Sequence, residues 1–202
     1  MVRRSLGARI GILGGTFDPP HIGHLIIAEQ ARQQLGLDKV LFIPAYVPPH
    51  KKNRATANPQ QRLAMVRRAI AGSRYFAATP LEIRRRGISY TVDTLKELRC
   101  TYVRAKLFLI VGGDNFAGFR TWKSVHEILK LSSIVVYNRH TLETSTPRVR
   151  ARKVFFLRGA ALNISSTMIR DRVRHNESIR YLVPERVEKF IRQNEMYKPT
   201  KK

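Results

Sequence analysis

Short apolar runs alternate with helical patterns along this chain, and the alternation limits the folds that it can adopt. Apolar runs typical of buried strands occupy residues 9–13, 39–43, 75–78, 107–111, 133–137 and 153–157. Helical spacing or capping signals lie between most of these runs and after the last one, at residues 22–35, 58–70, 90–98, 124–131, 166–174 and 184–193. Strands separated by helices predict right-handed crossovers. We expect an α/β fold with a parallel sheet, helices on both of its faces and a helical C-terminal end.

The length and composition of the chain indicate one globular domain. A chain of 202 residues that is 43% hydrophobic can bury a sizeable core. We expect a single domain over residues 1–202, with a core from about residue 8 to residue 195 and short basic termini. No apolar run reaches the ~18 residues of a membrane span, and the basic N-terminus lacks the apolar region of a signal peptide. The single cysteine, Cys100, excludes an internal disulfide, which predicts a cytoplasmic location.

The net charge is unusually positive. Lysine and arginine number 38 against 14 acidic residues, which gives a formal charge of +24. Such a field attracts phosphates, nucleotides and polyanions in general. The basic residues are spread over the chain, with clusters at residues 84–86, 148–153 and 170–174, and are not confined to a tail. We therefore do not expect nucleic acid as the main partner, and we keep a basic nucleic-acid-binding protein as an alternative.

The strongest motif lies at residues 14–24, which read GGTFDPPHIGH directly after the first apolar run. Gly14 and Gly15 allow a tight turn and a close approach of the backbone to a ligand. The helix that follows directs its free N–H groups and positive dipole end toward the same place, which favours an anion. His21 and His24 are three residues apart, so both imidazoles can contact one set of phosphates. Because ligands of open parallel sheets bind beyond the carboxyl ends of the strands, the motif predicts a phosphate site.

Other kinds of site use similar residues. Zinc needs a third ligand at metal spacing, and none is evident beside His21 and His24. A P-loop needs a following Gly-Lys-Ser/Thr, and the dinucleotide fingerprint needs a third glycine, and both are missing here. Paired glycines after a strand are also common in ordinary turns. The motif by itself therefore indicates only that a nucleotide phosphate could bind.

A second motif lies at residues 163–170, which read NISSTMIR. Ser165 or Ser166 is a good N-cap, and the helix that it begins again offers N–H donors. Arg170 lies one turn later, where its guanidinium can hold a phosphate through two hydrogen bonds. An ordinary capped surface helix would carry the same residues.

Together the two motifs resemble the nucleotidyltransferase superfamily, whose members transfer AMP or CMP from a nucleoside triphosphate. Between them, residues 43–51, 89–95 and 112–122 are similar to bacterial nicotinate mononucleotide adenylyltransferases. The resemblance covers roughly residues 10–194, and the order and spacing of the motifs fit as well. It implies a Rossmann-like nucleotidyltransferase fold.

The resemblance also implies the residues of the site. The implied catalytic residues are His21, His24 and Arg170. The implied ATP-binding residues are Gly14, Gly15, Thr16, Phe17, His21, His24, Asp114, Ser166, Thr167 and Arg170. The implied substrate-binding residues are Lys51, Thr91 and Trp122, with Lys51 at the mononucleotide phosphate. Plainer roles are open for some of them, because Trp122 could belong to the core and Asp114 could be a helix N-cap. Asp18 is interpreted as structural, tying the loop before Pro19.

The implied reaction is transfer of AMP from ATP to nicotinate mononucleotide, which gives nicotinate adenine dinucleotide and pyrophosphate. The mononucleotide phosphate is already a nucleophile, so positioning and charge neutralisation do most of the catalysis. Mg²⁺ would come with ATP, held largely by phosphates and water, so no metal site of protein ligands is expected. Nicotinamide mononucleotide and phosphopantetheine are the rival acceptors. We expect ATP and nicotinate mononucleotide as partners and no membrane association, and the oligomeric state stays open.

Overall fold

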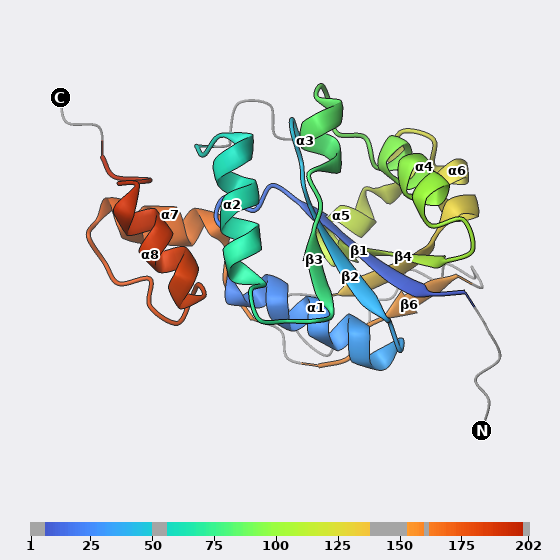
Figure 1. The fold of residues 1–202 in the computed structure, drawn as a ribbon, viewed down its shortest axis with the longest axis horizontal. Helices are drawn as coiled ribbons and strands as arrows, with labels where there is room; N and C mark the ends of the chain where they lie inside the picture. Colours follow the sequence, from blue (N-terminus) through green and yellow to red (C-terminus); the bar gives the residue numbers. More distant parts are fainter. Residues whose placement is uncertain (1–6, 50–55, 138–152, 160–161, 200–202) are drawn as a thin grey trace.

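A computed structural model describes residues 7–49, 56–137, 153–159 and 162–199 of the chain. Within these ranges six strands form one sheet, in the order β3-β2-β1-β4-β5-β6. The strands are β1 (Arg9–Gly15), β2 (Lys39–Pro44), β3 (Phe76–Ala78), β4 (Lys106–Gly112), β5 (Ser133–Tyr137) and β6 (Val154–Phe156). Every neighbouring pair is parallel. The parallel sheet that the alternation predicts is confirmed (Figure 1).

The helices in these ranges include six that the sequence predicts and three that it does not. They are α1 (Ile22–Gln34), α2 (Pro59–Ala69), α3 (Leu81–Arg85), α4 (Thr91–Thr101), α5 (Gly113–Ala117), η1 (Phe119–Thr121), α6 (Val125–Leu131), α7 (Ser166–Arg174) and α8 (Glu185–Gln193). The short helices α3, α5 and the 3-10 helix η1 were not expected, and α3 ends within a segment interpreted as a loop. A helix of one turn has too few positions to show a period of 3.6 residues.

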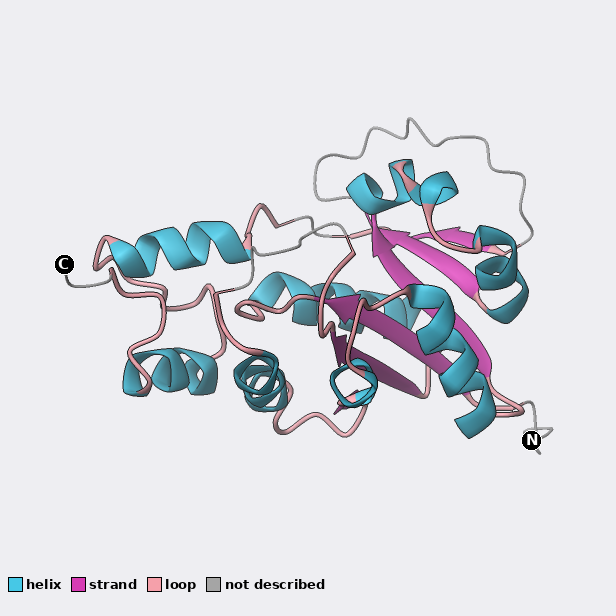
Figure 2. Cartoon of the chain, turned by 90° about the horizontal axis from the view of Figure 1, so that it is seen from above, coloured by secondary structure: helices cyan, strands magenta, loops and turns pink. Residues whose placement is uncertain are grey.

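The sheet is covered by helices on both faces, as expected (Figure 2). Successive residues of a strand point to opposite faces, so Leu13 belongs to one core cluster and Ile12 to the other. The first cluster buries Ala28 of α1 and Val66 of α2, and the second buries Leu95 of α4. Strands buried on both faces read as continuous apolar runs, which explains why the central strands were found in the sequence.

The C-terminal helices α7 and α8 extend the molecule beyond the sheet and lie beside α2 (Figure 1). Val187 and Ile191 of α8 are buried in the same cluster as Met65 of α2. The helical C-terminal end is therefore confirmed, and the segment after α8 brings Tyr197 into contact with Asp18 of the first motif. None of the helices in the described ranges is long and apolar enough to cross a membrane.

The order of the strands sets the place of the site. β1 and β4 are neighbours at the centre, and the chain continues to one side after β1 and to the other side after β4. The connections diverge at this point and leave a crevice beyond the carboxyl ends of the two strands, where ligands of such sheets bind. β1 ends at Gly15 and β4 ends at Gly112.

Candidate active site

The glycines of the first motif lie at the carboxyl end of β1. Gly14 and Gly15 belong to the extended strand, so the expected tight turn at the glycines is wrong. The chain turns instead at Phe17, whose φ is 52° and whose ring is buried. A Cβ added to Gly14 would meet no atom within 4 Å, so this position faces open space. The missing side chain therefore leaves room beside the backbone, as the sequence predicts.

The two histidines lie together at the start of α1. Their ring centroids are 3.8 Å apart, and His21 is buried while His24 is half-buried. A Cβ added to Gly23 would lie 3.0 Å from the His21 ring, so glycine lets this ring pack closely against the backbone of α1. The N–H of Ile22 donates to the Leu182 carbonyl at 3.0 Å. The first turn of α1 therefore offers fewer free N–H groups than the sequence predicts.

The backbone N–H of His21 determines which ring nitrogen of His24 carries the proton. The backbone N–H of His21 donates to Nδ1 of His24 at 3.1 Å. An Nδ1 that accepts a hydrogen bond carries no proton, so the neutral ring carries its proton on Nε2. His24 is thereby oriented as a hydrogen-bond donor through Nε2.

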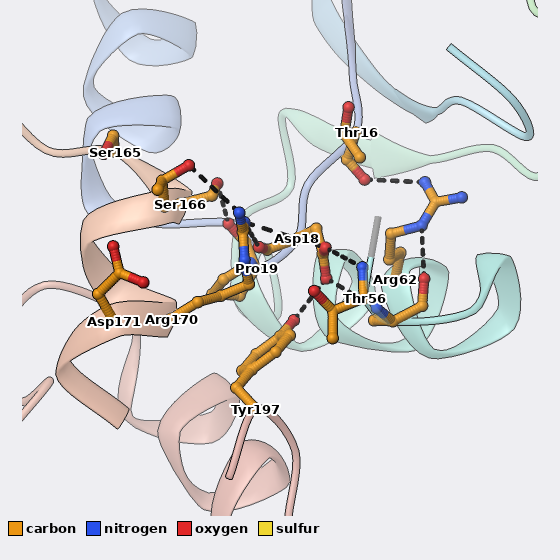
Figure 3. A network of polar contacts seen from close by, with 12 residues as sticks. Thr16, Asp18, Pro19, Thr56, Arg62, Ser165, Ser166, Arg170, Asp171 and Tyr197 are labelled. Atoms are coloured by element: carbon orange, nitrogen blue, oxygen red, sulfur yellow. Dashed lines mark hydrogen bonds and ion pairs between the residues drawn. The ribbon is translucent and has the colours of Figure 1, made fainter. Parts of the chain in front are cut away.

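The Asp18 carboxylate joins two distant segments of the chain, residues 56–57 and Tyr197, to the first motif (Figure 3). Its carboxylate is 2% exposed and accepts hydrogen bonds from the N–H groups of Thr56 at 2.7 Å and Ala57 at 3.2 Å. It also accepts from the Tyr197 hydroxyl at 2.7 Å. Burial and the nearby Asp18 charge raise the pKa of Tyr197, so its hydroxyl stays a donor. These contacts agree with the structural role expected for Asp18.

The second motif packs directly on the first (Figure 3). Ser165 caps α7 by accepting from the Met168 N–H at 3.1 Å, and the Ser166 hydroxyl donates to the Pro19 carbonyl at 2.8 Å. Arg170 donates through Nη1 to the Asp18 carbonyl at 2.7 Å. The two motifs thus form one unit, although they are 147 or more residues apart.

Arg170 and Thr167 keep part of their hydrogen-bonding capacity at this junction. Arg170 also donates through Nη2 to the Thr167 hydroxyl at 3.2 Å, and Thr167 is exposed. Arg170 Nε is buried and has no hydrogen-bond partner among the described residues. The arginine that was expected to hold a phosphate therefore also holds the loop of the first motif in place.

A cavity of about 430 Å³ opens between the ends of β1 and β4 and the start of α4. Gly14, Gly15 and Thr16 line it from one side, and Thr91 and Trp122 line it from the other. The half-buried Trp122 thus faces the cavity, and it also packs in the core against Phe119, with ring centroids 5.3 Å apart. The core and the substrate interpretations of Trp122 are therefore compatible. Five residues of the two predicted sets meet around one space.

Charged groups that the sequence reasoning did not single out also line this cavity. The Lys123 ammonium lies 4.3 Å from the centroid of the Tyr90 ring and 3.4 Å from an Asp93 carboxylate oxygen. Lys123 directly follows Trp122, and this position in the sequence could have marked it as a residue of the acceptor pocket.

Glu82 lines the same cavity and is 6% exposed. The Thr94 hydroxyl donates to its carboxylate at 2.6 Å, and the Ser89 side chain is a further hydrogen-bond partner. Burial raises the pKa of Glu82, and these two hydrogen bonds partly oppose that shift. No local pattern marked Glu82, because it belongs to the one-turn helix α3.

The start of α4 is also directed at this space. The helix begins at Thr91 after Tyr90, and no side chain caps its first N–H groups. Both residues line the cavity. Uncapped N–H groups at a helix N-terminus are donors for an anion.

The remaining predicted residues lie elsewhere. Asp114 is exposed in the first turn of α5, whose N-cap is Gly112, so the N-cap interpretation of Asp114 is wrong. The residues of the phosphate motifs that lie outside the lining of the cavity are Phe17, His21, His24, Ser166, Thr167 and Arg170. Lys51 falls outside the described residues. In the described ranges, no three His, Cys, Asp or Glu side chains are grouped so that they could hold a metal ion.

Solved structures share this architecture. A nicotinic acid mononucleotide adenylyltransferase from Plasmodium falciparum, complexed with NaAD, is similar with a TM-score of 0.79 and 15% sequence identity, over 94% of this chain and 97% of that one. A structure of the same enzyme complexed with APC gives a TM-score of 0.77, with the same identity and coverage. At this identity the likeness shows the fold, which is the Rossmann-like fold expected from the motifs.

Sequence comparison is more specific. A family model described as cytidylyltransferase-like matches residues 12–172. A protein of Desulfitobacterium hafniense, named "Probable nicotinate-nucleotide adenylyltransferase", is 43% identical over 199 residues, which covers 94% of this chain and 96% of that protein. A protein of Dictyoglomus turgidum with the same name is 44% identical over 195 residues and covers 94% and 95%. The chain therefore belongs to the cytidylyltransferase-like family and, within it, to the nicotinate-nucleotide adenylyltransferases that its motifs resemble.

Proposed function

We propose that this chain transfers AMP from ATP to nicotinate mononucleotide, forming nicotinate adenine dinucleotide and pyrophosphate. The observation that carries the proposal is the cavity that joins the glycines of β1 to Trp122 and the start of α4. A phosphate site and a pocket for an aromatic acceptor are thereby contiguous, which a bond between two nucleotides requires. We also propose that residues 1–202 form one nucleotidyltransferase domain, with its core at about residues 8–195.

ATP is proposed to bind where the two motifs meet. Gly14, Gly15 and the backbone at Thr16 and Phe17 leave room for the phosphates beside β1. From the other side, Ser166, Thr167 and Arg170 approach the same loop and face the phosphates. Asp114, at the end of β4, is proposed to contact the ribose.

The histidines supply donors for the charge that develops during the reaction. His24 carries its proton on Nε2, because Nδ1 accepts from the backbone of His21. It can therefore donate to a phosphate oxygen while neutral, and this donor is already oriented before the reaction begins. His21 lies against it at a centroid distance of 3.8 Å and is proposed to contact the same phosphates.

The mononucleotide is proposed to occupy the cavity. Trp122 offers a flat face on which a pyridine ring can stack. The uncapped N–H groups at Thr91 can donate hydrogen bonds to a ring carboxylate in the same cavity, which favours the acid over the neutral amide. Lys51 is proposed to meet the phosphate of the mononucleotide.

The reaction needs no covalent enzyme intermediate. A phosphate oxygen of the mononucleotide attacks the ATP α-phosphorus, the bond from that phosphorus to the β-phosphate oxygen breaks, and pyrophosphate leaves with the electron pair. Adenylyl transfer from ATP generally uses a divalent metal, which neutralises charge on the phosphates. The neighbouring Asp18 already accepts from Thr56, Ala57 and Tyr197, so the residues present fit Mg²⁺ that arrives with ATP and is held mainly by phosphates and water.

One assay tests this function. Pyrophosphate release is measured with ATP and Mg²⁺ in the presence of nicotinate mononucleotide, nicotinamide mononucleotide or phosphopantetheine. We expect the highest kcat/KM with nicotinate mononucleotide. Faster release with either of the other acceptors would change the proposed substrate. Salt-dependent polyanion binding without release from any acceptor would favour the nucleic-acid-binding alternative.

A further inference from the structure

Arg62 of α2 is one of the largest fully buried side chains in the described part of the protein. It is 1% exposed and shares the buried face of the helix with Leu63, Met65 and Val66. No carboxylate of the described residues lies within the 4.0 Å of an ion pair with its guanidinium. A buried cation costs several kcal/mol unless its N–H groups are satisfied. Its position in the apolar pattern of α2 therefore requires partners that the helix itself does not supply.

Those partners are backbone carbonyls from three separate segments. Arg62 donates through Nη1 to the Thr16 carbonyl at 2.8 Å (Figure 3). Thr16 begins the segment between β1 and α1, residues 16–21, which we call the phosphate loop. It donates through Nη2 to the Tyr46 carbonyl at 3.1 Å and through Nε to the Ala57 carbonyl at 3.2 Å. Thr16 lines the cavity on the phosphate side, and Tyr46 is in the segment that follows β2.

The hydrogen bonds continue from Tyr46 to the acceptor side of the cavity. The Tyr46 N–H donates to the Ser89 hydroxyl at 2.9 Å, and the Ser89 N–H donates to the Val47 carbonyl at 2.9 Å. Ser89 directly precedes Tyr90 and Thr91, where α4 begins. One guanidinium and one residue, Tyr46, therefore connect the phosphate loop to the segment that is proposed to receive the acceptor.

We propose that Arg62 is a positioning residue that holds the phosphate loop and the acceptor segment at a fixed separation. The inference rests on the proposed function, because its consequence is the alignment of the mononucleotide phosphate with the ATP α-phosphorus. A displacement of about 1 Å between reacting groups can cost about 100-fold in rate. Arg62 reaches neither substrate through its own contacts, since all three described hydrogen bonds go to backbone carbonyls.

The chemistry of the side chain supports this role. The three carbonyls lie in different directions around one planar group, which matches the fixed fork of a guanidinium. A lysine ammonium keeps the charge but cannot span the same three acceptors. Burial lowers the pKa of Arg62, and the charge of Asp18 partly opposes this shift. Arginine nevertheless stays protonated in proteins, so its five donors persist.

The test compares Arg62→Lys and Arg62→Met with the unmodified chain. Steady-state kinetics give kcat, and calorimetry gives Kd for ATP alone and for nicotinate mononucleotide alone. We expect kcat to fall about 100-fold while each single-ligand Kd changes less than about threefold, because each half of the site remains and only their alignment is lost. A folded Arg62→Lys variant with unchanged kcat would overturn the inference, and so would a loss confined to one Kd.

Two controls on α2 separate positioning from general destabilisation. Asn58 caps the helix by accepting from the Gln61 N–H at 2.9 Å, so Asn58→Ala should lower the thermal unfolding midpoint with kcat retained. Arg67 is exposed on the same helix, and Arg67→Lys should leave both unchanged. A fall in kcat in Asn58→Ala as large as that in Arg62→Lys would overturn the inference.

A double-mutant cycle tests the connection itself. Ser89→Ala removes the acceptor of the Tyr46 N–H, so it removes one of the two hydrogen bonds at the other end of the same link. We expect the loss in the double variant Arg62→Lys, Ser89→Ala to be smaller than the product of the single losses. A loss of kcat in the double variant equal to the product of the two single losses would overturn the inference. If neither Arg62 variant folds, the Ser89→Ala variant alone tests the inference. An unchanged kcat in Ser89→Ala would then contradict the connection from Arg62 through Tyr46 to Ser89. Absence of product with the unmodified chain would instead overturn the proposed function, and the inference with it.

Discussion

The phosphate loop and the acceptor side of the cavity are built differently. Behind the loop, outside the lining of the cavity, polar contacts join residues from opposite ends of the chain, such as Asp18 with Tyr197 and Pro19 with Ser166. On the acceptor side, the wall comes from the middle of the chain and combines Trp122 with the uncapped start of α4. The residues around the phosphate loop already satisfy many of their own polar groups, whereas the residues of the acceptor side border the open cavity of about 430 Å³.

This difference suggests two separate roles, stabilisation of charge by the phosphate loop and selection of the mononucleotide by the acceptor side. The phosphate loop is held by many contacts and can present donors in a fixed geometry, which suits stabilisation of charge in a transition state. The acceptor side offers an aromatic surface and uncapped N–H groups, which suits selection of one mononucleotide. Substitutions on the phosphate side should therefore affect turnover and stability, and those on the acceptor side should affect selectivity.

The largest effect is expected at His24. His24→Ala removes a donor oriented by the His21 backbone, so kcat should fall about 100- to 1,000-fold with the fold intact. Pyrophosphate release and circular dichroism check this. The exposed His126→Ala variant is the matched control and should keep full activity. Unchanged turnover in His24→Ala would remove this residue from the site.

The second-largest effect is expected at Arg170. Arg170→Lys retains the charge but loses the geometry that reaches the Asp18 carbonyl and the Thr167 hydroxyl, so kcat/KM for ATP should fall about 10- to 100-fold. The exposed Arg174→Lys variant on the same helix is the control. If both variants kept their kcat/KM for ATP, the proposed contact of Arg170 with phosphate would be wrong.

Trp122 tests the acceptor side. Trp122→Ala removes the stacking surface, so KM for nicotinate mononucleotide should rise about tenfold with little change in KM for ATP. Trp122→Phe keeps an aromatic face and should be intermediate. An equal rise in both KM values would contradict the separation of the two sides.

Tyr197 should matter for stability more than for chemistry. Tyr197→Phe removes one of the hydrogen bonds to buried Asp18, so the free energy of unfolding should fall by about 1–2 kcal/mol. Urea unfolding measures this, with the exposed Tyr181→Phe as control. Equal stability of the two variants would show that the C-terminal contact does not hold the phosphate loop.

Glu82 gives the smallest effect, and it depends on pH. Because burial raises the pKa of Glu82 above its ordinary 4.5, the folded state binds this proton more tightly than the unfolded state does. Its contribution to stability is therefore present below about pH 4.5 and is lost as the pH rises through the raised pKa. Glu82→Gln should flatten the fall in unfolding free energy over that window. An unchanged pH dependence would mean that the proton of Glu82 is not held in the folded state.

The sequence predicts the parts of this molecule that depend on local patterns. The central strands are continuous apolar runs, and the caps at Asn58 and Ser165 are read from neighbouring residues. Both phosphate motifs were found because each is contiguous, although their direct contact was implied only by the family resemblance.

The missed residues depend on contacts that no local pattern reports. The guanidinium of Arg62 is satisfied by carbonyls from residues 16, 46 and 57, which come together only in the fold. Glu82 lies in a helix of five residues, and its burial depends on Thr94 in another helix. A charged residue in the apolar pattern of α2 was the one available signal for Arg62.

The most direct test of the division between the two sides is a crossed binding experiment. ATP and nicotinate mononucleotide are titrated separately by calorimetry into Arg170→Lys and into Trp122→Ala. The account predicts that Arg170→Lys weakens ATP binding about tenfold with mononucleotide binding retained, and that Trp122→Ala does the reverse. Both variants weakening the same ligand would contradict it.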